Sequence, residues 1–227
     1  MSSIKTKAVR FATRRGSVEG GSRVERRKAR THQALIDATH SLLASRSIDA
    51  LSVDEIAERA DVAKGTFYNY FADKDALARE LAANVRARVE GEITRINAKV
   101  SDPAVRIARA FTCVLRFGMR EPQQALAMIR MFPHAIDPSA PLNTGVRADV
   151  VSGLASKRIV APSAEIAIAS IVGTAAAGLN RVLDLTPAEA VAFTRELGII
   201  LLHGLGLSRA QASRIMAAAV ASVLTDE

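Results

Sequence analysis

The chain has 227 residues, of which 49% are hydrophobic and 24% charged, so it can bury a core and is not a disordered polymer. Its length allows one or two domains. The net charge is +8, and the first 30 residues supply all of it, with ten Lys and Arg against two Glu. A basic block of this kind suits a polyanion such as DNA, or it serves solubility alone.

Cysteine content and hydropathy limit the cellular compartments in which we expect the protein to act. The single cysteine, Cys113, excludes an intrachain disulfide and fits a reducing compartment. The basic N-terminus has no apolar segment behind it, so it does not resemble a secretory signal. The longest uncharged apolar stretch, 166–180, is shorter than the ~18–20 residues of a spanning helix. We expect a cytoplasmic protein that does not associate with membranes.

The first predicted elements are an arm and a helix. Residues 1–23 are rich in Gly and Arg and lack an apolar period, so we expect a flexible basic arm. Its positive charges, together with those up to Arg30, suit phosphate or minor-groove contacts. Apolar residues then recur at helical spacing between about 26 and 45, which predicts an amphipathic helix.

Three short predicted helices, that one included, precede a long one. Ser52 and Glu55 form a capping box in front of a two-turn helix that reaches about residue 60. Asp61 can close a tight corner, because Asp tolerates the left-handed conformation. A short helix follows over 64–71, and Asp73 is the N-cap of a helix that reaches about residue 99. This succession is typical of a helix-turn-helix unit.

The rest of the chain also shows helical patterns only, separated by prolines and glycines. Helices are predicted at about 103–120, 122–133, 145–158, 162–184, 187–205 and 208–223, with a loop over 133–145. The fold class is therefore all-α. The predicted domains are a helix-turn-helix domain at 24–90, centred on 52–71, and a helical bundle at 91–227.

An aromatic cluster carries the first functional signal. Four of the nine aromatic residues are Phe67, Tyr68, Tyr70 and Phe71. Phe67 and Phe71 share one helical face, which leaves Tyr68 to point outward together with Lys64, Thr66 and Asn69. Such clusters are usually core, but the capped helix and the corner before this one favour DNA recognition. A tyrosine can contact a thymine methyl and a phosphate, and lysines at 64 and 74 suit phosphates.

The segments 52–60, 61–71 and 74–77 closely resemble the DNA-binding domain of the TetR (tetracycline-repressor-like) family. The resemblance covers roughly residues 28–88 and beyond that rests on architecture. It implies that four residues approach bases (Lys64, Gly65, Thr66 and Tyr68), with Asn69 a further candidate. It implies phosphate contacts for Tyr70 and Lys74, and backbone amides at Ser52 that face the DNA. The family commonly has Gly at the position of Asp61 and Ser at that of Ala63, and the missing cap is expected to cost about 0.5–2 kcal/mol.

The same resemblance implies an effector pocket and a dimer interface in the C-terminal domain. Clustered Phe and Met residues suit an adaptable apolar pocket, or they form ordinary bundle core. The candidate pocket residues are Phe111, Phe117, Met128, Met131 and Phe132. Charges in these segments are arginines, which gives a mild preference for an apolar or weakly anionic effector. Small residues that permit close helix approach mark a candidate interface, or an intrachain helix pair: Ala169, Gly173, Ala176, Ala177, with the apolar Leu201 in the next helix.

No enzyme signature is present. The four histidines lack metal-ligand spacing, and there is neither a glycine-rich phosphate loop nor a Gly-x-Ser-x-Gly sequence. We therefore expect no metal, no cofactor and no catalysis. The sequence predicts a homodimeric regulator, a repressor released from a palindromic operator by a small molecule. The alternatives are an effector-independent or activating regulator, and a helical ligand carrier or enzyme with a vestigial DNA-binding head.

Overall fold

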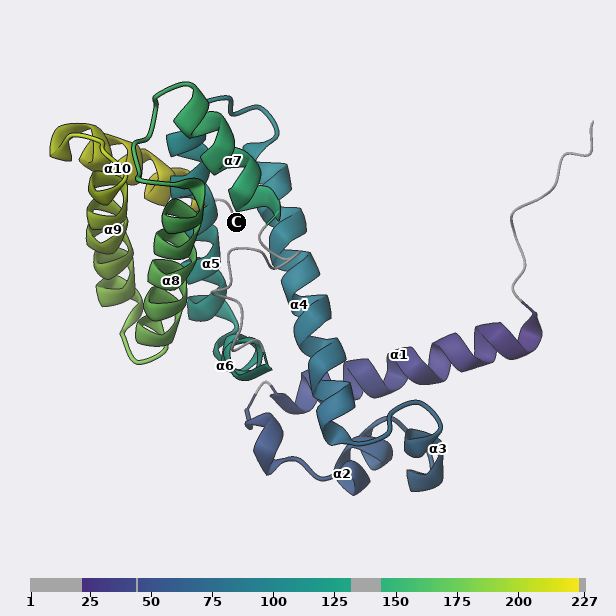
Figure 1. The fold of residues 1–227 in the computed structure, drawn as a ribbon. Coiled ribbons are helices and arrows are strands. Elements are labelled where there is room, and N and C mark those ends of the chain that lie inside the picture. Colours follow the sequence, from purple (N-terminus) through teal and green to yellow (C-terminus); the bar gives the residue numbers. More distant parts are fainter. Residues whose placement is uncertain (1–21, 44, 132–143, 225–227) are drawn as a thin grey trace, which may run out of the picture.

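The computed structural model describes residues 22–43, 45–131 and 144–224, and these residues contain helices and no strand. Figure 1 shows two parts joined by one long helix. The lower part contains α1 (Arg23–Leu43), the 3-10 turn η1 (Ile48–Ala50), α2 (Val53–Arg59), α3 (Lys64–Tyr68) and the start of α4 (Lys74–Asn97). The upper part contains α5 (Pro103–Arg120), α6 (Pro122–Met131), α7 (Thr144–Ala155), α8 (Ala164–Val182), α9 (Pro187–Gly204) and α10 (Arg209–Leu224). The predicted all-α architecture is confirmed.

Each part has its own hydrophobic core, and α4 contributes to both. The first core lies among η1 and α1–α4: Leu35, Ile36, Leu43, Ile48, Leu51, Ile56, Phe67, Phe71, Leu77, Ala78 and Leu81. The second core takes α4 from Val85 onward and extends to Ala219 of α10. Helix α5 is central to it and contacts α4 and α6–α10. A continuous α4 therefore connects the two cores mechanically.

Side-chain caps start the helices where the sequence predicts them. Asp102 accepts hydrogen bonds from the amides of Ala104 and Val105, and Pro103 occupies the first turn of α5. Thr186 and Glu189 form a capping box at α9. The helix starts predicted at the prolines 103, 122 and 187 are confirmed.

The largest differences from the predicted boundaries are at α1, at α3 and at α7, which ends at Ala155 rather than near residue 158. Helix α1 begins at Arg23 and has 21 residues, so it is not short. The cause is a local signal: the Ser22 amide donates to Glu25 Oε2 at 2.5 Å and the Glu25 amide to Ser22 Oγ at 3.2 Å. Helix α3 ends at Tyr68 rather than near 70–71. The predicted arm, up to residue 21, and nearly all of the predicted loop lie outside the described residues.

Candidate nucleic-acid interface

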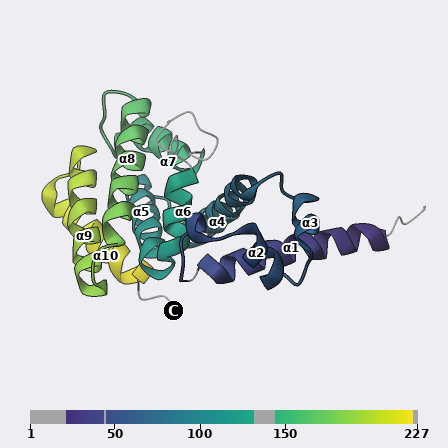
Figure 2. The same cartoon turned by 90° about the horizontal axis from the view of Figure 1, so that it is seen from below.

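The corner between α2 and α3 has the geometry that the sequence predicts. Asp61 adopts φ = 55°, in the left-handed region. The Asp61 amide donates to the Glu58 carbonyl and the Val62 amide to the Ala57 carbonyl, both at 3.0 Å, which closes the last turn of α2. The chain is thereby turned so that α3 starts immediately after α2. Figure 2 shows α1, α2 and α3 at the opposite end of the molecule from α8, α9 and α10.

The start of α2 is held by a network on its surface. The Ser52 amide donates to Glu55 Oε2 at 2.8 Å, and the Glu55 amide donates to Ser52 Oγ at 3.2 Å. Arg46 Nη1 donates to Glu55 Oε1 at 2.6 Å. The hydrogen bonds from Arg46 and then from Ser52 lower the pKa of Glu55 to about 2. The predicted capping box is therefore present, reinforced by an arginine that the sequence pattern did not single out.

Helix α3 has one buried face and one exposed face. Phe67 is fully buried and Phe71, just beyond α3, is 3% exposed, whereas the Tyr68 side chain is 51% exposed. Phe67 meets Tyr68 edge-on, with ring centroids 5.4 Å apart. Lys64 and Asn69 are exposed and Thr66 is half-buried. The predicted division into an inward Phe face and an outward polar face is therefore what the structure shows.

Gly65 has no intrachain reason to be glycine. It lies within α3 at an ordinary helical conformation, and a Cβ built on it meets no atom within 4 Å. Glycine inside a helix costs roughly 0.5–1 kcal/mol relative to alanine. Gly65 is unfavourable for the helix itself, and the absence of a side chain leaves space beside α3. Both features suit the close approach of another molecule.

Lys64 forms an ion pair next to this open surface. Its Nζ lies 2.8 Å from Asp54 Oδ2 on the first turn of α2, and both side chains are more than half exposed. The hydrogen bond to Asp54 raises the pKa of Lys64. Lys64 therefore stays charged, but a carboxylate neighbours its ammonium.

Two predicted phosphate contacts have partners within the chain. Lys74 Nζ donates to the carbonyls of Asp49 at 3.1 Å and Leu51 at 3.0 Å, so it fastens η1 to the start of α4. Tyr70 is half-buried against the first core, and its ring centroid lies 6.0 Å from that of His32. His32 also stacks on Phe71 and contacts Glu80 of α4 at 3.0 Å. These residues set the position of α3. A phosphate that approached Lys74 would find its ammonium group already hydrogen-bonded to two carbonyls.

The structure describes the side chains of only some candidate pocket residues. Phe111 and Phe117 are buried in the second core. Met128 and Met131 lie on α6, but their side chains, like all of Phe132, lie outside the described residues. Phe117 faces the Arg88 guanidinium of α4 at 5.8 Å, and Arg88 Nη2 donates to Gln124 Oε1 of α6 at 2.7 Å. One predicted pocket residue is thus connected to both α4 and α6.

The basis for an anionic effector is weaker than the sequence indicates. Arg106 Nε lies 2.5 Å from Asp149 of α7, and Arg116, buried on α5, forms an ion pair with Glu92 of α4. These two arginines have carboxylate partners within the chain and are not waiting for an external anion. Both pairs join segments far apart in sequence, which is why no local pattern could reveal them.

The candidate interface residues divide between surface and core. Ala177 of α8 is exposed, whereas Ala169, Gly173 and Ala176 are half-exposed, and a Cβ on Gly173 meets no atom within 4 Å. Leu201 is only 6% exposed and belongs to the second core of its own chain, so its side chain does not line an outer face. The preceding residue is the exposed one: Ile200 is 67% exposed, and Ile166 of α8 is 50% exposed. Periodicity marked α9 as apolar but did not resolve which side faces out.

The described residues also bear on the expectations for metal ligands, the cysteine and the histidines. Those residues contain no group of three or more His, Cys, Asp or Glu that could hold a metal ion. Burial raises the pKa of Cys113 to about 11, so the thiol stays protonated. His203 Nδ1 lies 2.8 Å from the Leu207 carbonyl. None of the described helices is long and apolar enough to cross a bilayer.

A capped short helix, a left-handed corner and a second short helix with an exposed polar face define a helix-turn-helix protein, here joined to a helical second domain. Residues 35–81 match the sequence model for bacterial regulatory proteins of the tetR family. Over these residues the chain matches the N-terminal domain of the TetR family, and it is similar to transcriptional regulators of that family.

Similar proteins agree with this assignment. The chain is 45% identical over 47 residues to the uncharacterized regulator YdeS of Bacillus subtilis, covering 21% of this chain and 24% of YdeS. It is 32% identical over 111 residues to the transcriptional repressor KstR of Rhodococcus jostii, 49% of each chain. The chain thus spans half or less of the length of these relatives. The crystal structure of RolR with its ligand resorcinol has the same fold, with a TM-score of 0.64 at 22% identity over 86% of this chain and 96% of RolR.

Proposed function

We propose that the protein is a homodimeric transcriptional repressor that binds a palindromic operator through α3 and leaves it when a small molecule binds the C-terminal domain. The observation that carries the DNA contact is the outward face of α3. Tyr68 is exposed there, Gly65 leaves room for close approach, and Phe67 anchors the helix from behind. Thr66 and Tyr68 would contact base edges, with Lys64 and Asn69 beside them. The protein is thus a regulator and not an enzyme, and it acts in the cytoplasm.

A two-fold dimer follows from the operator that such a protein reads. Two recognition helices reach successive major grooves when they are about 34–36 Å apart. Figure 1 shows α8 and α9 running side by side at the edge of the second part that lies away from α4. Ile166 and Ile200 are exposed apolar residues on these two helices, and Gly173 leaves α8 open to a closely packed neighbour. We infer that α8 and α9 pair with their symmetry mates.

An apolar effector site is proposed near α5 and α6. Phe111 and Phe117 would form its described walls, with Met128, Met131 and Phe132 as further candidates. The contact from Phe117 through Arg88 to Gln124 connects that region to α4, which also belongs to the core of the DNA-binding domain. An effector that favours a different spacing of α4 would thereby lower operator affinity. RolR, whose fold is similar, was crystallised with its ligand resorcinol, which supports a small-molecule ligand for a chain of this fold.

The test is selection of duplexes from a random pool, followed by binding measurements with α3 variants. Thr66→Ala and Tyr68→Ala are each expected to weaken operator binding by about 1–3 kcal/mol while sparing random duplex. Gly65→Ala separates folding from binding: it is expected to stabilise the domain by about 0.5–1 kcal/mol and yet weaken operator binding.

Three results would revise the proposal. Unchanged operator preference in both Thr66→Ala and Tyr68→Ala would overturn the assignment of α3. A selected site without two-fold symmetry would overturn the dimer. Operator binding that no small molecule changes, over a library that includes phenols and acyl esters, would favour an effector-independent regulator.

A further inference from the structure

A carboxylate occupies a surface that is otherwise suited to a polyanion. Asp54 lies on the first turn of α2, and the corner between the helices brings it to Lys64 on the first turn of α3, with 2.8 Å between Oδ2 and Nζ. The Asp54 side chain is 66% exposed and that of Lys64 is 55% exposed. The carboxylate thus lies beside one of the proposed base-contacting residues.

Asp54 differs from its neighbours on α2. Glu55 is engaged by Ser52 and Arg46 in starting the helix. Asp54 takes no part in that network, and among the described residues its side chain accepts a hydrogen bond from Lys64 instead. An exposed ion pair of this kind contributes little to folding, since both charges are well solvated before they meet. Its consequences are therefore expected in binding.

The chemistry of duplex DNA gives this pair two different environments. Phosphates offer acceptors only, so on nonspecific DNA the carboxylate gains no hydrogen bond, repels the backbone and holds the ammonium of Lys64. A C·G base pair offers both partners in the major groove. The cytosine N4 amino group donates to a carboxylate, and guanine O6 and N7 accept from lysine.

We infer that Asp54 and Lys64 together form a specificity element that reads a C·G base pair in each half-site and weakens binding to all other DNA. The inference rests on the proposed function, since it assigns a specificity-determining residue within the same interface. Asp54 acts in two ways. It accepts a base hydrogen bond at the correct site, and it penalises every site where that hydrogen bond is missing.

The test compares Asp54→Asn with Asp184→Asn. Both variants remove the negative charge of an exposed, ion-paired aspartate, but Asp184 lies in the turn after α8, in the second domain. Dissociation constants for the selected operator and for a random duplex of the same length are measured over a range of NaCl concentrations. Asp54→Asn is expected to bind random duplex about 3- to 10-fold more tightly, because Lys64 becomes available to a phosphate. The slope of log affinity against log salt is expected to steepen by about 0.9, the value for one additional phosphate contact.

Sequence preference gives the second readout. Selection with Asp54→Asn is expected to relax the preference at one C·G pair per half-site, so that the ratio of operator to random affinity falls about 10-fold or more. Asp54→Glu keeps the charge and is expected to retain weak binding to random duplex. Asp184→Asn is expected to match the wild type in both readouts.

The possible failures are distinguishable. A wild-type protein with no salt-dependent affinity for duplex DNA would overturn the proposed function, and the inference with it. A wild-type protein that discriminates between sites, while Asp54→Asn matches Asp184→Asn in random affinity and in base preference, would overturn the inference alone. Unfolding curves measured for each variant show whether a change in binding comes from altered folding.

Discussion

The two domains place their charged groups differently. In the helix-turn-helix domain, the ion pairs Arg46–Glu55 and Lys64–Asp54 lie on the surface and join residues about ten positions apart. In the C-terminal domain, the pairs Arg106–Asp149 and Arg116–Glu92 join separate helices and are more deeply buried. Arg116 reaches Glu92 of α4 and the Val223 carbonyl of α10.

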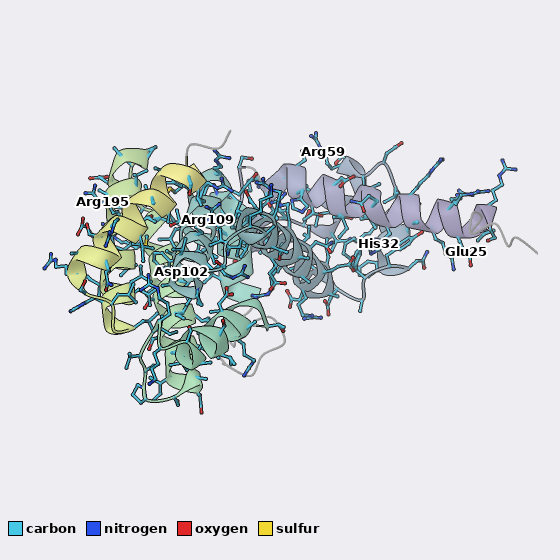
Figure 3. The ribbon with its side chains drawn as sticks, turned by 90° about the horizontal axis from the view of Figure 1, so that it is seen from above. Glu25, His32, Arg59, Asp102, Arg109 and Arg195 are labelled. Carbon is cyan, nitrogen blue, oxygen red and sulfur yellow. The ribbon has the colours of Figure 1, made fainter. Side chains whose placement is uncertain are left out.

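This difference has a consequence for function. Surface charges in the first domain remain available to a partner, whereas those inside the second are consumed in holding helices together. Figure 3 makes the contrast visible along α1: Glu25 lies at the far tip of the helix with no other element around it, whereas His32 lies further along, where other helices begin. Residues 22–30 are all exposed and carry five Lys or Arg. The outer turns of α1 therefore extend the basic surface beyond the first core.

The strongest test of this two-core description is Phe67→Ala. Phe67 is fully buried in the first core, and its loss is expected to destabilise that domain by about 3–5 kcal/mol. Amide hydrogen exchange should show lost protection in α1–α3 with protection largely kept in α8–α10. Equal loss of protection in α8–α10 would mean that the two cores unfold as one cooperative unit.

The second domain is tested by Glu92→Ala. The substitution removes the Glu92 carboxylate from its ion pair with the buried Arg116, and because Glu92 is partly exposed the expected cost is about 2–3 kcal/mol, below that of a fully buried pair. Chemical denaturation measures the change. Glu196→Ala removes the carboxylate of an exposed pair on α9 and is expected to change stability by less than about 0.5 kcal/mol. Similar losses in the two variants would show that burial of Arg116 is not what matters.

A smaller effect, with a defined pH dependence, is expected at the start of α2. Ser52→Ala removes the cap and is expected to cost about 1 kcal/mol. The pKa of Glu55 is about 2 in the folded protein and 4.5 ordinarily, so the stability that its ionisation contributes is complete above about pH 4.5 and is lost as the pH falls toward 2.

The unfolding free energies of wild type and Glu55→Ala, measured from pH 7 down to pH 2, should therefore converge toward the acid end. A difference that stays constant through this range would mean that the ionised carboxylate is not responsible.

The sequence predicts the first domain in detail because its signals are local. Ser52 and Glu55 are three residues apart, Asp61 acts on its own backbone, and Phe67 and Phe71 are one helical turn apart. The start of α1 was equally predictable in principle, since Ser22 and Glu25 form the same kind of capping box. It was missed because no apolar period accompanies these turns.

The second domain is less accessible from the sequence because its interactions are remote. An apolar run predicts that α9 is buried but does not tell which side faces its own core. Leu201 was therefore a candidate for the outer face, whereas in the structure Leu201 is buried and Ile200 is exposed. The arginines of α5 could be counted, but their carboxylate partners lie on α4 and α7. The role of Lys74 depends on two backbone carbonyls of η1, which carry no sequence signal.

The most direct test of the central claim is a hydroxyl-radical footprint of the wild-type protein on its selected duplex. The account predicts two protected patches related by a two-fold axis, whose centres are about 10–10.5 base pairs apart, or a multiple of that spacing. A footprint that is absent, or confined to a single patch without symmetry, would contradict it.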